Sequence, residues 1–205
     1  AYMVNITAAL HVVGTVPYGI ITNYDWLVLP LFFFLASILF FGGLGGSMFK
    51  VAYNYLGRLP GGLAMATIGA ISIFSAISGS SIAAAITIGT IALPEMKKYK
   101  YDDSLATACV AAGGTLDILI PPSSIFIIYG ILTETSIVKL FVAGIIPGVI
   151  LSLLFMAMIY IRARLNPIMA PPGVGTSLRE KLVATAECVD VVVLIGLVLG
   201  GLIIG

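Results

Sequence analysis

The fold of this chain is decided by residues 61–93, which read GGLAMATIGAISIFSAISGSSIAAAITIGTIAL. Within them, two apolar runs flank a polar, helix-unfriendly cluster, Ser78-Gly79-Ser80-Ser81. A second cluster, Pro121-Pro122-Ser123-Ser124, interrupts another apolar stretch in the same way. Because lipid cannot satisfy backbone amides and carbonyls, irregular backbone at membrane depth is tolerated only where protein buries it or where it lines a cavity. Paired breaks of this kind indicate the midplane binding site of a transporter.

The composition is that of an integral membrane protein. Hydrophobic residues make up 60% of the 205 positions and charged residues only 9%. The run from Ile137 to Ile161 exceeds the roughly 20 apolar residues that cross a bilayer. The 23 glycines and 10 prolines suit packed and broken helices. We predict an all-α polytopic protein in the lipid bilayer. A net charge of +1 without a basic tract argues against a nucleic-acid partner.

The residues that usually carry enzyme chemistry are scarce. Cys109 and Cys188 lie in apolar helical sequence without the spacing of a metal or redox pair. His11 is the only histidine, so a nucleophilic serine in the first cluster has no base at its depth. We therefore expect neither an enzyme nor an organic cofactor. The chain lacks the basic start of a signal peptide and ends inside an apolar run, so we interpret it as part of a longer protein.

Charge and hydropathy divide the chain into seven segments. Lys50, Asn54 and Arg58 fall at i, i+4 and i+8, which predicts one polar stripe on a helix too short to span. Such a helix lies in the membrane interface or simply connects two spans. Pro94 opens a hydrophilic loop after the second apolar run. The predicted segments are transmembrane helices over 1–44 (the first one truncated), the amphipathic helix over 45–60, a helical pair over 61–93, a broken transmembrane helix over 103–133, a transmembrane helix over 137–162, a cytoplasmic linker over 163–181 and the start of another transmembrane helix over 182–205.

The positive charges favour a re-entrant hairpin over residues 61–93. Lys50 and Arg58 precede this pair of apolar runs, and three lysines follow it. A single crossing would place the two basic groups on opposite sides, whereas a hairpin leaves both in the cytoplasm, as the positive-inside tendency prefers. Each run is also short for a full crossing. With the hairpin, every lysine and arginine except Lys139 lies on the cytoplasmic side.

Broken helices supply both kinds of electrostatic partner that a co-transporter needs. Helix C-termini and free carbonyls suit a hard monovalent cation such as sodium, and helix N-termini suit a substrate carboxylate. Ser80 or Ser81 can cap the second arm of the hairpin. In the second break, Pro121 and Pro122 end one half-helix, and Ser123 opens the next. The alternative is that these small residues serve only close packing between helices.

Asp117 is the one carboxylate deep in an apolar run. Ionisable residues inside a membrane are costly, and they usually have a function. No lysine or arginine of this chain lies at a similar depth. Three roles remain open for Asp117: ligand of a cation, carrier of a proton, or acceptor for a backbone amide exposed at the break.

Several motifs in a fixed order resemble one family, the large membrane subunit of tripartite ATP-independent periplasmic (TRAP) transporters. The similarity runs from about Tyr24 to the C-terminus. The motifs are LPGGLA at 59–64, SGSS at 78–81, PEM at 94–96, AGGT at 112–115, IPPS at 120–123, YG at 129–130 and AGIIPG at 143–148.

The resemblance implies sodium-coupled import of organic acids, such as C4-dicarboxylates, sialic acid or other sugar acids, by an elevator mechanism. It also implies a periplasmic substrate-binding protein, a small membrane subunit and a place in the bacterial inner membrane. Residues 1–44 would belong to a static scaffold, 45–60 to an arm, and 61–93 and 103–133 to a moving transport domain. A second, inverted half would lie outside this chain.

The resemblance also assigns site residues. The coupling sodium ion would be held by Ser78, Gly79, Ser80, Ser81, Gly114, Thr115, Pro121 and Ser123. We assign substrate contacts to Ser81, Asp117, Pro122, Ser123 and Ser124. Two rival functions stay open, namely an ion-coupled citrate or dicarboxylate transporter that needs no binding protein, and a purely structural membrane subunit.

Overall fold

The computed structural model describes residues 6–173 and 178–189, together with residues 193, 194, 196, 197, 200 and 201. Their regular structure is helical, and no strand occurs among them, which confirms the predicted all-α class. Part of the segment predicted over 182–205 lies outside the described residues. The elements are α1 (Ile6–Thr22), η1 (Tyr24–Leu27), α2 (Val28–Phe41), α3 (Leu44–Leu56), α4 (Gly62–Ser78), α5 (Ser81–Lys98), α6 (Asp103–Gly114), η2 (Thr115–Ile118), α7 (Ser124–Leu132), α8 (Ile137–Leu165) and α9 (Leu178–Glu187).

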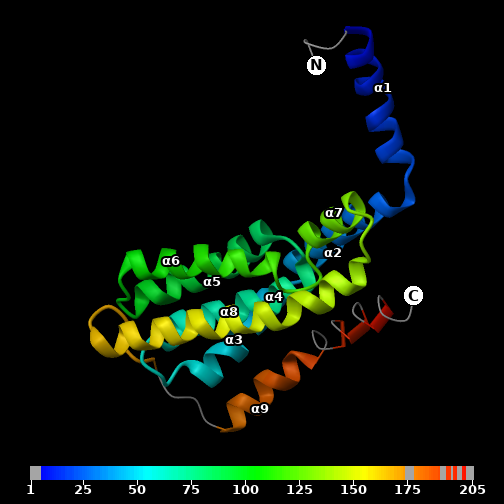
Figure 1. The fold of residues 1–205 in the computed structure, drawn as a ribbon. Coiled ribbons are helices and arrows are strands. Elements are labelled where there is room, and N and C mark those ends of the chain that lie inside the picture. Colours follow the sequence, from blue (N-terminus) through cyan, green and yellow to red (C-terminus); the bar gives the residue numbers. More distant parts are fainter. Residues whose placement is uncertain (1–5, 174–177, 190–192, 195, 198–199, 202–205) are drawn as a thin grey trace.

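Helix α4 forms the centre of an elongated bundle, from which α1 projects (Figure 1). It packs against α3, α5, α6 and α8. Its alanines Ala64, Ala66 and Ala70 are fully buried, and such small residues allow neighbouring helices to approach closely. The core of the bundle is therefore assembled around the first arm of the predicted hairpin.

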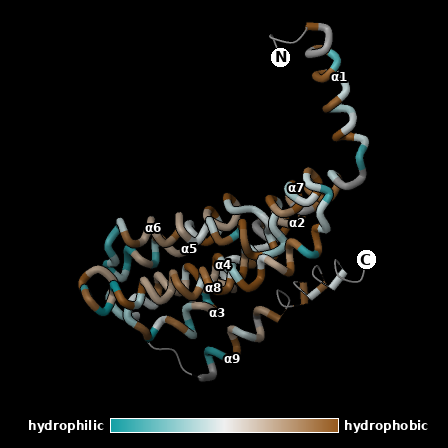
Figure 2. Tube along the Cα trace, viewed as in Figure 1, coloured by the Kyte–Doolittle hydropathy of each residue, from teal (hydrophilic) through white to brown (hydrophobic). Residues whose placement is uncertain are grey.

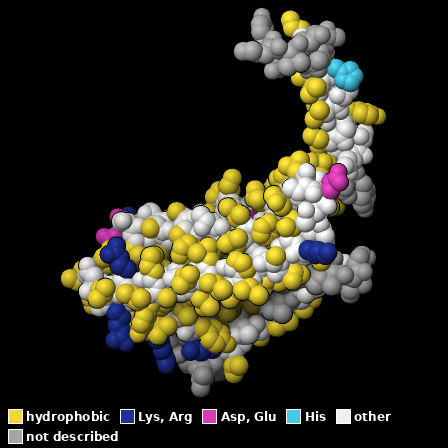
Figure 3. Space-filling view, viewed as in Figure 1, with side chains coloured by type: hydrophobic (Ala, Val, Ile, Leu, Met, Phe, Trp, Pro, Cys, Tyr) yellow, Lys and Arg dark blue, Asp and Glu magenta, His cyan; other side chains and the backbone are white. Residues whose placement is uncertain are grey.

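The outer face of the bundle is apolar. Among the described helices, α8 is the one that is long and apolar enough to cross a membrane, judged by its 29 residues and composition. Large side chains on α8, such as Ile146, Leu153 and Leu154, are exposed. Figure 2 shows hydrophobic residues along the bundle helices, and Figure 3 shows basic side chains at the left end and lower edge of the bundle, with one at its right end. An apolar surface of this extent with basic ends fits a helix bundle in lipid.

Helices α4 and α5 fold back on each other. The chain reverses at Gly79, and the two helices pack along their length. At the opposite end, the backbone N–H of Leu63 donates to the hydroxyl of Tyr101 at 3.3 Å. The start of α4 and the residues just after α5 therefore meet, so residues 61–93 do not form one continuous rod.

The connection after α8 runs beneath the base of this helical pair. The N–H of Gly61 donates to the Ala170 carbonyl at 3.3 Å, and the N–H of Asp102 donates to the Met169 carbonyl at 3.0 Å. Because both bonds are between backbone groups, the linker holds the two ends of the pair together whatever its side chains are.

We expect Tyr101→Phe to loosen the base of the helical pair. Tyr101 is 5% exposed, and burial raises the pKa of its phenol to about 12, so the hydroxyl stays protonated at neutral pH. Removing it leaves the buried Leu63 N–H without an acceptor, at a cost of about 1–3 kcal/mol. The free energy of unfolding in detergent measures this loss. Tyr55→Phe is the control, since the Tyr55 hydroxyl bonds Thr185 in an exposed place. Equal effects of the two variants would contradict the expectation.

Two details of the sequence interpretation differ in the structure. Helix α5 continues through Pro94 to Lys98 instead of ending near Leu93. Proline removes only its own donor, and the helix resumes with the Tyr99 N–H donating to the Glu95 carbonyl at 3.1 Å. The basic residues of this last turn also favour the negative end of the helix dipole.

The predicted polar stripe on residues 45–60 is only partly exposed. Lys50 and Arg58 are exposed, whereas Asn54 is 6% exposed. Helix α9 packs on this side of α3, and the Asn54 side-chain amide donates to the Glu180 carbonyl at 3.3 Å. Arg58 lies beyond the end of α3 at Leu56. The spacing of the polar residues did not reveal that another helix would cover the middle of the stripe.

Candidate functional site

The hairpin tip consists of a left-handed glycine followed by a capping serine. Gly79 ends α4 with φ +56°, and its N–H donates to the Ser75 carbonyl at 3.3 Å. Glycine adopts this conformation without the strain that a Cβ would add. The Ser80 Oγ accepts from the Ala83 N–H at 3.4 Å and so caps α5. Of the two serines predicted as candidate caps, the structure selects Ser80.

The second break separates α6 from α7. After Gly114 the helix tightens over Thr115–Ile118, where the Thr115 hydroxyl donates to the Ala112 carbonyl at 2.7 Å. Pro121 and Pro122 follow, and both are buried. Neither can donate a backbone hydrogen bond, so the helix stops and restarts only at Ser124.

The two breaks meet at one place, which we call the junction and define as residues 78–81 with residues 114–123. A Cβ placed on Gly79 would lie 2.8 Å from the carbonyl oxygen of Pro122. Ser81 Oγ donates to Asp117 Oδ2 at 3.3 Å. A Cβ on Gly114 would lie 3.6 Å from the Ser81 carbonyl oxygen. Clusters more than 30 residues apart in sequence are thus in direct contact.

The remaining predicted site residues differ in how deeply they lie. Ser78 and Ser123 are fully buried, and Ser80 and Ser124 are half-buried. The side chain of Thr115 is exposed and bonded to its own helix, so this hydroxyl is already engaged.

Three buried side-chain oxygens at or beside the junction lack a hydrogen-bond partner among the described residues. They belong to Ser75 (Oγ), Asp117 (Oδ1) and Ser123 (Oγ). A buried polar atom without a partner costs free energy, and each such atom calls for an explanation. Ser75 escaped the sequence reasoning, although its position one helical turn before Gly79 could have pointed to it.

Asp117 lies against the start of α5. The carboxylate has the hydroxyls of Ser75 and Ser81 and the backbone N–H groups of Ser80 and Ser81 beside it. Its side chain is 1% exposed. An acidic group at a helix N-terminus is stabilised by the unpaired amides there. Of the three roles left open above, the position of Asp117 beside these amides favours that of an acceptor for backbone amides.

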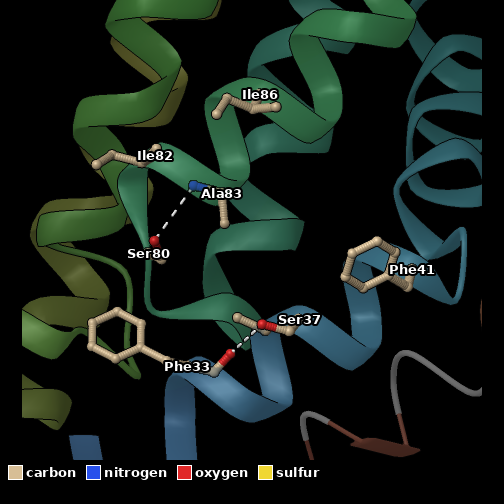
Figure 4. Close-up of a pocket in the computed structure, with 8 residues that line it drawn as sticks. Phe33, Ser37, Phe41, Ser80, Ile82, Ala83 and Ile86 are labelled. Atoms are coloured by element: carbon tan, nitrogen blue, oxygen red, sulfur yellow. Dashed lines mark hydrogen bonds between the residues drawn. The ribbon is translucent and has the colours of Figure 1, made fainter. Parts of the chain in front are cut away.

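Two apolar cavities adjoin the junction. One, of about 370 Å³, separates Phe33, Ser37 and Phe41 of α2 from Ser80, Ile82 and other residues of the first turns of α5 (Figure 4). The other, of about 450 Å³, lies between α4 and α8 and includes Pro121 in its lining. Ser80 and Pro121 are therefore the predicted site residues that line these two cavities.

The oxygens at the junction suit a monovalent cation better than a transition metal. Among the described residues, no group of three or more His, Cys, Asp and Glu side chains gathers to hold a metal. The junction instead offers hydroxyl, carboxylate and unwound carbonyl oxygens, the ligands that broken transporter helices present to sodium. Of the three unpartnered oxygens, the Ser123 hydroxyl fits this donor set best, since the Ser75 hydroxyl lies beside the Asp117 carboxylate.

An all-helical bundle with an apolar outer face, whose helices break at one buried junction, defines a membrane protein of the transporter type. The chain belongs to a family of such proteins, because residues 2–205 match the family described as "Tripartite ATP-independent periplasmic transporter, DctM component". The resemblance drawn from the sequence motifs is thereby confirmed.

Curated relatives agree with this family. The chain is 38% identical over 183 residues to the C4-dicarboxylate TRAP transporter large permease protein DctM of Pseudomonas aeruginosa, covering 89% of this chain and 42% of that protein. It is 38% identical over 160 residues to the ectoine/5-hydroxyectoine large permease UehC of Ruegeria pomeroyi (78% and 37%). It is 37% identical over 138 residues to the sialic acid permease SiaT of Haemophilus influenzae (67% and 22%). The chain spans less than half the length of these relatives.

Proposed function

We propose that this chain works within a sodium-coupled importer of organic acids and that the junction holds the coupling cation. The observation that carries the proposal is the meeting of two unwound segments around buried oxygens without hydrogen-bond partners. A cation at this place would give the buried Ser123 hydroxyl the partner that it lacks. The substrate carboxylate would lie near the half-helix N-terminus at Ser123–Ser124, where unpaired amides favour negative charge.

The helical pair α4–α5 would form a re-entrant hairpin of the moving transport domain. Its two basic flanks, Lys50 with Arg58 and the lysines at 97, 98 and 100, support a common cytoplasmic side. Helix α3, the proposed arm, packs closely along α4. Helix α2, in the proposed scaffold, faces the start of α5 across the 370 Å³ cavity. The close packing of α3 on α4 and the cavity between α2 and α5 are consistent with a moving unit that includes α4 and α5.

The partners and substrates are proposed from the family. A periplasmic binding protein would deliver the substrate, and a small membrane subunit would complete the transporter. The named substrates of the relatives are C4-dicarboxylates, sialic acid and ectoine. Carboxylate-bearing solutes are therefore the first class to test, and the bacterial inner membrane is the proposed location.

Uptake into proteoliposomes tests this function. The complete permease that contains this chain is reconstituted with its small subunit and binding protein, and a panel of organic and sugar acids is offered with and without an inward sodium gradient. We expect uptake of one acid class only with the gradient and the binding protein. Equal uptake with and without the sodium gradient would contradict sodium coupling. Uptake without the binding protein would favour the rival function, an ion-coupled transporter that needs no binding protein.

We expect Ser123→Ala to weaken sodium without weakening the fold. The Ser123 hydroxyl is fully buried and has no hydrogen-bond partner, so the folded protein loses no bond with it. If the hydroxyl is a cation ligand, its removal raises the sodium concentration for half-maximal uptake about three- to tenfold, in line with one lost polar contact. Sodium titration of uptake and unfolding in detergent give the two readouts.

Ser72→Ala is the matched control for Ser123→Ala. Ser72 Oγ bonds the Ile68 carbonyl at 2.8 Å and Ser152 Oγ at 3.1 Å, so its hydroxyl is engaged within α4 and with α8, and Ser72 is not a residue of the junction. This variant should lower stability slightly and leave the sodium requirement unchanged. The proposal for Ser123 fails if both variants leave the sodium requirement at its original value.

A further inference from the structure

Asp117 joins three elements that are distant in sequence. It lies in η2, where its Oδ2 accepts a hydrogen bond from Ser81 in the first turn of α5. The amides of Ser80 and Ser81 and the hydroxyl of Ser75, in the last turn of α4, lie beside the same carboxylate. Both ends of the hairpin tip therefore face one side chain that belongs to the second break.

The burial of Asp117 excludes it from direct contact with a bulky substrate in this conformation. The side chain is 1% exposed, and it is absent from the linings of the two cavities beside the junction. A substrate carboxylate at the same helix N-terminus would also meet a group of its own charge. The predicted role of Asp117 as a substrate ligand therefore has no geometric support here.

The contacts of Asp117 fit a structural role, in which its carboxyl group holds the start of α5 in place. The first amides of a helix have no partner within the helix, and in an apolar setting an acceptor from another element fixes them in place. Ser80 caps α5 from within the tip, and Asp117 adds a carboxyl acceptor from across the junction. When the carboxyl is ionised, such hydrogen bonds are about twice as strong as neutral ones.

We propose that Asp117 is a positioning residue that fastens the hairpin tip to the second break and thereby sets the affinity for the coupling cation. The second half of this statement rests on the proposed function. A cation at the junction takes ligands from both the tip and the break, so its affinity depends on how firmly these two segments are held in register. Weakening the contact between Asp117 and the hairpin tip therefore lowers the affinity for the cation, even when every atom that binds the cation is retained.

Asp117→Asn is the decisive variant. Asparagine keeps the size of the side chain and an oxygen that can accept from Ser81, but an NH₂ donor replaces the second carboxylate oxygen that faces the tip amides. We expect hydrogen exchange of the tip amides, residues 78–84, to become about tenfold faster, since a charge–helix contact of this strength corresponds to roughly one power of ten. The measurement is made on the complete permease in detergent without sodium, so that it reports the contact itself.

The sodium requirement of uptake supplies the second readout. We expect Asp117→Asn to raise the half-saturating sodium concentration about tenfold with little change in the maximal rate. Ser81→Ala should act in the same direction, and the double variant should exceed Asp117→Asn only slightly, because the two side chains form one contact. Asp103→Asn is the control, since Asp103 is an exposed acid in the first turn of α6.

The outcomes separate this proposal from its rivals. Unchanged exchange of the tip in Asp117→Asn overturns it. A difference in exchange that arises only when sodium is present also overturns it, because Asp117 would then be a cation ligand and not a positioning residue. Wild-type uptake without sodium dependence would remove the proposed coupling, yet the sodium-free exchange experiment would still decide whether Asp117 fastens the tip.

Discussion

Gly79→Ala should reduce uptake at least tenfold while the protein still reaches the membrane. Two independent reasons act at this position. The residue has φ +56°, where a side chain costs on the order of 1 kcal/mol. A Cβ there would also lie 2.8 Å from the Pro122 carbonyl oxygen, a contact with backbone that cannot rotate away. The tip must therefore separate from the second break, which disrupts the proposed cation site. Initial uptake rates, normalised to the amount of permease, measure the effect.

Gly43→Ala separates the two causes. Gly43 has φ +74°, but a Cβ on it would have no atom within 4 Å. This variant carries the conformational strain without the contact, so it should lower stability by on the order of 1 kcal/mol and leave uptake largely intact. If Gly43→Ala impairs uptake as strongly as Gly79→Ala, backbone strain alone is responsible and the contact with Pro122 is not required.

The sequence predicted those features of the fold that depend on a few neighbouring residues, such as the two helix breaks. Glycine, proline and serine clusters act on the few residues around them, so the reversal at 78–81 and the interruption at 121–124 could be placed closely. The helix ends were less certain, because the carboxyl end of α5 depends on interactions after Pro94. The motifs sufficed to identify the family.

The sequence was less informative where contacts depend on which helix faces meet. Asn54 looked like part of an exposed stripe until α9 covered it. Ser75 looked like one more small residue in α4, although its Oγ is buried without a partner beside Asp117. The role of Asp117 also stayed open, since spacing along the chain does not tell which amides a side chain will meet. These facts require the tertiary arrangement.

The second large effect is expected from Gly144→Ala in α8. A Cβ on Gly144 would lie 2.5 Å from the Leu119 carbonyl oxygen and 2.5 Å from the ring of Phe126. One turn later, a Cβ on Gly148 would lie 2.9 Å from the side chain of Ile120. The glycines of α8 thus let the second break lie directly on this helix. Alanine at 144 should push the break away from α8, at a cost of about 1–3 kcal/mol for an overpacked site.

Because Leu119 directly precedes Ile120 and the two prolines, this displacement should propagate to the junction and lower uptake about tenfold or more, given that 1.4 kcal/mol corresponds to a factor of ten. Phe126→Leu would relieve only the ring contact, so it should not restore uptake to Gly144→Ala. Gly46→Ala is the control, since a Cβ on this helical glycine would meet nothing within 4 Å; it should leave uptake unchanged and raise stability by up to about 1 kcal/mol. Full rescue by Phe126→Leu would show that the ring, and not the carbonyl of Leu119, sets the distance between α8 and the break.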